Sequence, residues 1–170
     1  MSREFRPLTY YFALLNGIAN ICRVITGVSL VVLTGIFGWL VYGRYVLNST
    51  PTWVEQVALL LIMVIAFLGA AVGVHDNTHL SVELLRNSVS KRIKFGLIVL
   101  SHIILGVFGY YMLAYGTQLT IFKWGSMIPL IHVPEGLRSL PLAIGGALIL
   151  LFSIGHLLRL AVGQSSQFTE

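Results

Sequence analysis

Charge is what this sequence has least of. Only 10% of its 170 residues are Asp, Glu, Lys or Arg, against about 25% in an ordinary soluble domain. Four stretches contain no charged residue at all: 24–43, 56–75, 95–122 and 139–158. A helix needs about 20 apolar residues to cross a bilayer core of about 30 Å. The scarcity of charge therefore excludes an attached soluble domain and predicts helices that span a membrane.

The expected fold is an all-α integral membrane protein with four transmembrane helices and short amphipathic interfacial helices. Residues 1–170 are expected to form a single four-helix domain. The predicted spans are about 24–46, 53–75, 95–122 and 137–158.

Several other features are absent. The single cysteine, Cys22, cannot form an internal disulfide. No phosphate loop, nucleophile elbow or HExxH sequence occurs, so neither an enzyme nor a bound cofactor is predicted. No A-x-A cleavage site follows a short apolar region, so the N-terminus is expected to be retained. The net charge is +5, and the Lys and Arg residues lie mainly at the helix flanks. This distribution indicates membrane topology and not nucleic-acid binding.

Apart from tyrosines, the ionisable groups inside the four charge-free stretches are limited to His75, His102 and His156. Ion and proton pathways usually place carboxylates within the membrane, and none is present there. Two interpretations of the histidines stay open. They are interfacial side chains bonded to backbone, water or headgroups, or two of them ligate a haem, as in a membrane anchor subunit of a respiratory complex.

The distribution of Lys and Arg predicts the orientation. The basic residues that precede span 1, separate spans 2 and 3, or follow span 4 are Arg3, Arg6, Arg23, Arg86, Lys91, Arg92, Lys94 and Arg159. The basic residues on the other side are Arg44, Lys123 and Arg138. The positive-inside rule then places both termini and the 76–94 loop in the cytoplasm, with 44–55 and 123–138 facing outward.

Two segments are predicted to be amphipathic interfacial helices. Residues 7–22 are uncharged and lead into span 1, with an apolar stripe at helical spacing that comprises Leu14, Ile18, Ile21 and Ile25. Residues 76–94 form the second segment. Its basic residues are expected to contact anionic phospholipid, and they are Arg86, Lys91, Arg92 and Lys94.

The outward end of the spans carries aromatic residues typical of a membrane boundary: Trp39, Tyr42, Tyr45, Trp53 and Trp124. Thr52 and Glu55 have capping-box spacing, which predicts that Thr52 caps span 2 and that Glu55 reaches back to the cap. Two readings of Glu55 stay open. It acts as a cap residue alone, or it also makes a polar contact on the outer face, by itself or with Arg44.

Three features concern packing. Gly69 and Gly73 are small residues four apart, a spacing that lets helix backbones approach closely in lipid. Span 95–122 is longer than a bilayer requires, so it either tilts strongly or projects beyond the hydrocarbon at residues 117–120. The apolar segment 124–137 cannot be a continuous helix through Pro129. It is expected to fold into the membrane interface or to lie against another protein.

The middle of the chain carries five short motifs in order: Arg44-Tyr45, Asn48, Trp53-x-Glu55, Phe67-Leu68-Gly69-Ala70 and His79-Leu80-Ser81-Val82-Glu83-Leu84-Leu85. In these motifs and in the order of its four spans, the chain resembles the small membrane subunit of tripartite ATP-independent periplasmic (TRAP) transporters, the DctQ-like family. One departure is Gln56, where the family often has a second acidic residue.

This resemblance implies an accessory role. Such a subunit supports the large membrane subunit of a sodium-coupled importer of organic acids, such as sialic acid or a C4-dicarboxylate, in the bacterial inner membrane. A periplasmic substrate-binding protein delivers the solute, and the small subunit helps to dock it. The expected partner-binding residues are Arg44, Tyr45, Asn48, Trp53, Glu55, Lys123 and Trp124.

Overall fold

The computed structural model describes residues 6–76 and 91–161. They form four helices: α1 (Arg6–Tyr45), α2 (Trp53–His75), α4 (Lys91–Phe122) and α5 (Gly136–Ala161). Each contains a segment long and apolar enough to cross a membrane, and these segments are Ala13–Tyr45, Trp53–His75, Gly96–Phe122 and Gly136–Leu158. The predicted all-α fold with four spans is confirmed, whereas the predicted orientation stays a prediction.

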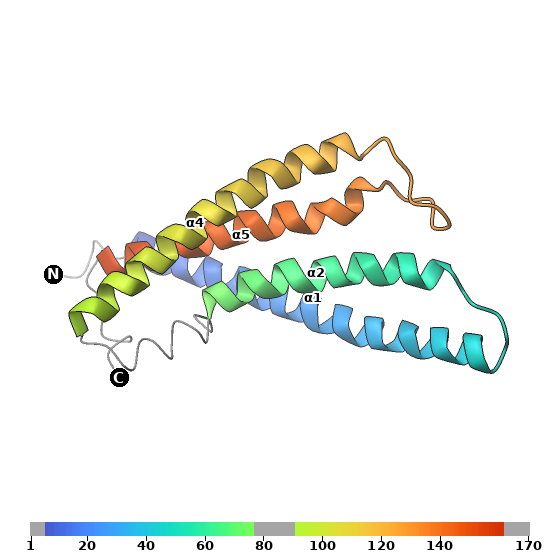
Figure 1. Cartoon of the computed structure of the whole chain (residues 1–170). Coiled ribbons are helices and arrows are strands. Elements are labelled where there is room, and N and C mark those ends of the chain that lie inside the picture. The colour runs from blue at the N-terminus through green and yellow to red at the C-terminus, as the bar shows by residue number, and fades with distance from the viewer. Residues whose placement is uncertain (1–5, 77–90, 162–170) are drawn as a thin grey trace.

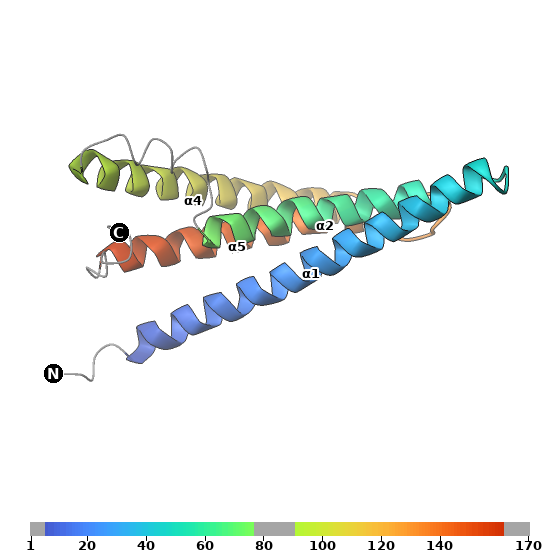
Figure 2. The same cartoon turned by 90° about the horizontal axis from the view of Figure 1, so that it is seen from below.

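The helices lie in a row instead of closing into a bundle. α4 packs along α5, α5 packs on α2, and α2 packs on α1, while α1 and α5 touch only briefly. Figure 1 shows this order from α4 to α1, and Figure 2 shows α1 diverging from the other helices toward its N-terminal end. We call the end that holds the 46–52 and 123–135 connections the outer end, and the opposite end the inner end. A row leaves each helix with faces available to lipid or to a partner.

The segment 7–22 is not a separate interfacial helix, because α1 runs without a break from Arg6 to Tyr45. No proline interrupts this stretch after Pro7, whose position in the first turn is compatible with a helix. Of the predicted apolar stripe, Leu14, Ile21 and Ile25 are exposed and Ile18 is partly buried. The buried side chains of this segment are instead Leu15, Ala19 and Cys22.

The second predicted interfacial helix, 76–94, falls largely on residues 77–90, which lie outside the described residues. α4 begins at Lys91. At its other end α4 continues through residues 117–120 as regular helix, where Thr117 and Thr120 donate their hydroxyls to backbone carbonyls one turn earlier.

The main core cluster lies where α1, α2, α4 and α5 meet. It comprises Leu15, Ala19, Cys22, Leu68, Ala71, Val74, Met112, Leu148, Ile149 and Phe152. Glycines bring α4 and α5 together beside it. A Cβ atom at Gly146 would lie 2.6 Å from the Leu113 backbone nitrogen, and one at Gly109 would lie 2.9 Å from the Gly146 carbonyl oxygen. Only a residue without a side chain permits this approach of two backbones in lipid.

Candidate functional site

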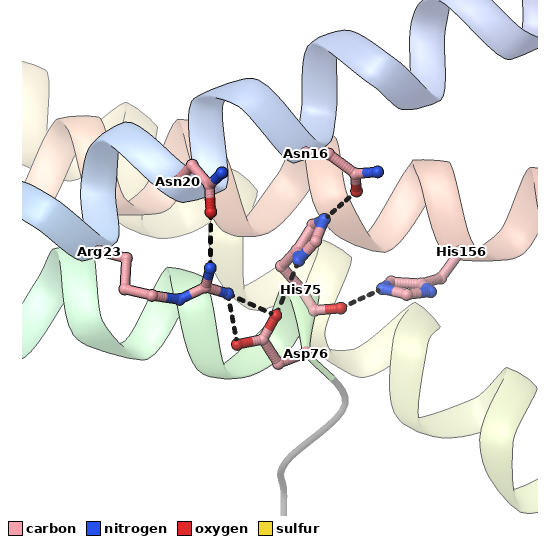
Figure 3. A network of polar contacts seen from close by, with 6 residues as sticks. All are labelled: Asn16, Asn20, Arg23, His75, Asp76 and His156. Atoms are coloured by element: carbon pink, nitrogen blue, oxygen red, sulfur yellow. Dashed lines mark hydrogen bonds and ion pairs between the residues drawn. The ribbon is translucent and has the colours of Figure 1, made fainter.

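Polar side chains gather at the inner end of the row and join three helices, as Figure 3 shows. α1 contributes residues spaced four and three apart, which places them on one face of the helix. α2 contributes His75, the residue after α2 is Asp76, and α5 contributes His156. We call this set the inner polar network, and its members are Asn16, Asn20, Arg23, His75, Asp76 and His156.

An ion pair between α1 and the end of α2 is the strongest contact of the network. Arg23 Nη2 donates to Asp76 Oδ2 at 2.9 Å and to Oδ1 at 3.1 Å, and Nη1 donates to Asn20 Oδ1 at 2.6 Å. Burial alone would raise the pKa of the Asp76 carboxyl. Hydrogen bonds from His75 and Arg23, together with their charges, outweigh that effect and lower its pKa below the ordinary value. The carboxylate also lies at the negative end of the α2 dipole, an unfavourable position that the Arg23 cation offsets.

His75 and His156 complete the end of α2. The two ring nitrogens of His75 lie 3.0 Å from Asp76 Oδ1 and 2.9 Å from Asn16 Oδ1. His156 donates from Nε2 to the His75 carbonyl oxygen at 3.1 Å. That carbonyl belongs to the last turn of α2, where no intrahelical donor is available. The network therefore satisfies a helix end and ties α1, α2 and α5 together.

The geometry of the histidines does not favour a haem. His102 and His156 pack edge to face with ring centroids 4.9 Å apart, so no space for a macrocycle separates them. His102 donates from Nδ1 to the Ile98 carbonyl oxygen in its own helix. Both ring nitrogens of His75 are engaged by side chains. Within residues 6–76 and 91–161, no group of three or more His, Cys, Asp or Glu is arranged to hold a metal ion. These histidines act as packing and hydrogen-bonding groups.

The 123–135 connection at the outer end folds back on itself. Lys123 Nζ donates to Glu135 Oε1 at 2.7 Å across its base. The Lys123 hydrogen bond lowers the pKa of the partly buried Glu135 carboxyl. Backbone hydrogen bonds close the turn, with Ile128 N donating to Val133 O and Glu135 N donating to Ser126 O. Ile128 is buried with 2% of its surface exposed, which fixes the turn against the helix ends.

Two residues of this turn adopt left-handed backbone conformations that side chains disfavour, Leu130 at φ 75° and His132 at φ 51°. Leu130 and Met127 expose their side chains at the tip. The apolar segment is therefore a formed turn, whose contact with lipid or protein stays a prediction.

Arg138 links α5 to α2 at the outer end. Its Nη2 donates to Gln56 Oε1 at 2.7 Å. Its Nε is buried and has no hydrogen-bond partner among the residues that the structure describes. In the sequence, Arg138 is notable only for its charge and Gln56 only as a departure from a family pattern. The pair could not be found from spacing, because 82 residues separate its members.

The predicted partner-binding residues lie together at the outer end. Arg44 and Tyr45 end α1, Asn48 adopts φ 49° in the connection, and Trp53 and Glu55 open α2. All five are exposed. The structure describes no ion pair between Arg44 and Glu55 in this part of the chain. Lys123 and Trp124 belong to the neighbouring turn, where Lys123 is paired with Glu135.

The predicted capping box is wrong. Thr52 makes no side-chain cap hydrogen bond and has helical backbone angles of φ −63° and ψ −21°. An N-cap residue normally has extended angles, which let its hydroxyl reach the free amides. Here Pro51 begins the turn one residue earlier, since Val54 N donates to the Pro51 carbonyl at 3.1 Å. Glu55 keeps its favourable place in the first turn of α2.

The predicted packing and lipid residues are only partly described. A Cβ atom at Gly69 would lie 3.7 Å from Thr26 Cγ2, an ordinary contact, so close approach within this chain does not depend on Gly69. Gly73 lies one turn further along α2. Arg86 lies outside the described residues, and the side chains of Lys91, Arg92 and Lys94 are not described. Their contact with phospholipid stays a prediction.

Comparison with known proteins bears on the identity of this four-helix row. The family described as tripartite ATP-independent periplasmic transporters, DctQ component, matches residues 33–163, more than half of the chain. The sialic acid TRAP transporter small permease protein SiaQ of Vibrio cholerae serotype O1 is 24% identical over 82 residues. That match covers 48% of this chain and 47% of the relative, so the chain matches about half of the relative's length.

Proposed function

The chain belongs to the DctQ component family of tripartite ATP-independent periplasmic transporters, and on this premise we propose that it is the scaffold subunit of a sodium-coupled importer of organic acids. Its family and its four apolar helices make it a multi-pass protein of the bacterial inner membrane and a TRAP small permease subunit. In the proposed role it carries no solute. It supports the large membrane subunit and helps to dock the periplasmic substrate-binding protein.

The observation that carries the scaffold role is the open row of helices. Transport sites are usually built where helices enclose ionisable groups. Here the polar side chains that cluster within or beside the spans bond to each other and to helix ends. In residues 6–76 and 91–161, no group of three or more His, Cys, Asp or Glu could hold a metal ion, and long apolar faces of the row are exposed. Such exposed faces suit a protein that supports a neighbour.

The proposed solute is a carboxylate. This rests on the name of the SiaQ relative, whose transporter handles sialic acid. A C4-dicarboxylate is the other candidate from the family resemblance.

Affinity purification from the native membrane tests the assignment. A larger polytopic protein should accompany this chain, and this chain reconstituted alone should show no uptake. Uptake by the chain alone in proteoliposomes would sink the scaffold role. Arrival of soluble redox subunits in place of a polytopic partner would point to an anchor of a respiratory complex.

The proposed docking face for the binding protein is the exposed group around Arg44. Arg44→Glu reverses a cation that is unpaired among the described residues, so it should weaken binding of the periplasmic protein to the assembled complex. Thr50→Glu is the matched control, because it adds the same charge to the same exposed connection without removing a cation. Binding is measured on the reconstituted complex. Loss of the large subunit from Arg44→Glu would instead identify Arg44 as an assembly residue.

A further inference from the structure

Three tyrosines on α4 turn outward from the protein. Tyr110, Tyr111 and Tyr115 have 57%, 52% and 62% of their surface exposed. Tyr111 and Tyr115 stack with ring centroids 6.0 Å apart and planes 10° apart, and Tyr110 meets Tyr111 edge to face at 5.7 Å. They form one continuous aromatic surface, which we call the tyrosine face.

The tyrosine face lies near the middle of the membrane. The apolar segment of α4 runs from Gly96 to Phe122, so residue 109 is its midpoint. An independent marker agrees, because Gly109 lies against Gly146, and residue 147 is the midpoint of the Gly136–Leu158 segment of α5. Tyr111 stands about 3 Å of helix beyond this midpoint and Tyr115 about 9 Å. Half of a hydrocarbon core is about 15 Å, so all three tyrosines lie inside it.

Tyrosine is unusual at this depth on a lipid-facing surface. Its ring favours the interface, where the hydroxyl reaches water or headgroups. Lipid chains offer a hydroxyl no hydrogen bond, which makes its exposure to them costly. Among the described residues, no hydrogen bond from these three hydroxyls is found, which leaves them available to acceptors on a partner.

α1 shows the opposite pattern on its own exposed surface. Its central exposed side chains are aliphatic, such as Val24, Val28 and Val31. Its one polar group there, the Thr34 hydroxyl, donates to the Leu30 carbonyl within the helix. Within residues 24–45 of α1, the exposed aromatic residues with polar tips are Trp39, Tyr42 and Tyr45, and all three lie near the outer end, where the boundary is expected. The exposed surface of α1 is therefore suited to lipid.

We propose that the tyrosine face of α4, formed by Tyr110, Tyr111 and Tyr115, is the surface that packs against a helix of the large membrane subunit. This inference rests on the proposed function, which supplies the large subunit as the membrane partner. The partner helix presents polar side chains or free carbonyl groups to the three hydroxyls at mid-membrane depth. Tyrosine suits such a surface because it combines a large apolar ring with a hydrogen-bonding tip. α1 then faces lipid on the opposite edge of the row.

Site-specific photo-cross-linking in the native complex tests the assignment. A benzophenone amino acid replaces Tyr111 in one variant and Val31 of α1 in the control, at positions that are 52% and 72% exposed. Cross-linking of position 111, but not of position 31, to the large subunit is the expected result. Cross-linking of position 111 only to lipid, or only to a second copy of this chain, overturns the proposal. So does cross-linking of position 31 to the large subunit while position 111 gives none.

A second measurement isolates the hydroxyls. Tyr111→Phe with Tyr115→Phe keeps both rings, so the isolated small subunit should melt at the wild-type temperature. Its affinity for the large subunit should fall roughly tenfold, from two lost intramembrane hydrogen bonds. Unchanged affinity overturns the hydrogen-bonding role. The proposed function fails separately, and the inference with it, if the unmodified chain brings no large polytopic protein from the membrane.

Discussion

Arg23 Nη2 lies 2.9 Å from Asp76 Oδ2, and this ion pair joins α1 to the residue that ends α2. The pair is half-open to solvent, with 52% of the Arg23 side chain and 34% of the Asp76 side chain exposed. An ion pair of this exposure contributes roughly 0.2–1 kcal/mol. Its importance is geometric, because it fixes where the long α1 helix crosses the inner end of the row.

Acid should loosen this contact. The pKa of Asp76 is lowered in the folded protein, so its stabilisation is complete above the ordinary carboxyl value of about 3.9 and is lost as the pH falls toward the lowered value. At pH values under about 4, the melting temperature in detergent should therefore decrease. The decrease should be smaller in Asp76→Asn than in the wild type. Glu55→Gln is the control, since it removes an exposed carboxylate that makes no ion pair in the described part of the chain. An identical acid response of wild type and Asp76→Asn would contradict this account.

A methyl group should separate the two kinds of glycine. Gly146→Ala places a Cβ atom 2.6 Å from the Leu113 nitrogen, so α4 and α5 must move apart at a cost of about 1–3 kcal/mol. Gly69→Ala meets only an ordinary 3.7 Å contact and gains helix propensity of up to about 1 kcal/mol. The melting temperature in detergent should thus be lower than that of the wild type for Gly146→Ala, and equal or higher for Gly69→Ala. Equal behaviour of both would show that the α4–α5 approach is not constrained by backbone contact.

An acidic residue at position 56 should strengthen the outer end. Gln56→Glu would convert the hydrogen bond to Arg138 into an ion pair and offer an oxygen to the buried Nε. We expect a gain of about 0.5–1 kcal/mol in the free energy of unfolding, read from thermal unfolding at pH 7. The double variant Gln56→Glu, Arg138→Met lacks the cation. An equal gain in its free energy of unfolding, relative to Arg138→Met alone, would rule out the ion pair as the source. Glu55→Gln, one residue away on the exposed side, should give no such gain, because it removes a carboxylate from the first turn of α2.

The proposed sodium coupling should survive replacement of the histidines. His102 donates to the Ile98 carbonyl and packs on His156, so both act as structural groups. His102→Ala or His156→Ala should lower thermal stability yet leave the ratio of sodium to solute unchanged, measured in proteoliposomes that also contain the large subunit. A changed ratio in either variant would place these side chains in the ion pathway.

Much of this architecture was predictable along the chain. Charge-free stretches of bilayer length predicted the four spans, and the resemblance of residues 44–85 to a TRAP small subunit is confirmed by the family match over residues 33–163. The predictions for helix starts were weaker. The Thr52 cap failed because spacing alone does not report that Pro51 already begins the turn. The prediction of a separate helix at 7–22 was wrong, because Arg23 does not end the apolar helix. Its charge is paired with Asp76, the residue that follows α2.

The candidate sites were likewise predicted only in part. Exposure of the predicted residues around Arg44 followed from their place between spans, while their contact with a partner stays a prediction. The inner polar network was missed, although one signal was present. Arg23 near the start of one span and Asp76 at the end of the next are opposite charges that an antiparallel pair of helices brings to the same level.

The sequence by itself determined that this is a membrane protein. The free energy of removing apolar side chains from water depends on which residues are present, and the charge-free stretches are long enough to cross a bilayer. Only the tertiary structure decided that the helices form a row and that Gly146, not Gly69, lies where two helix backbones approach closely. The same holds for the outward turn of Tyr111 at mid-membrane depth. These features depend on which helix faces meet. Within a bilayer, apolar faces differ little in their affinity for lipid, so shape and hydrogen bonding choose the neighbours.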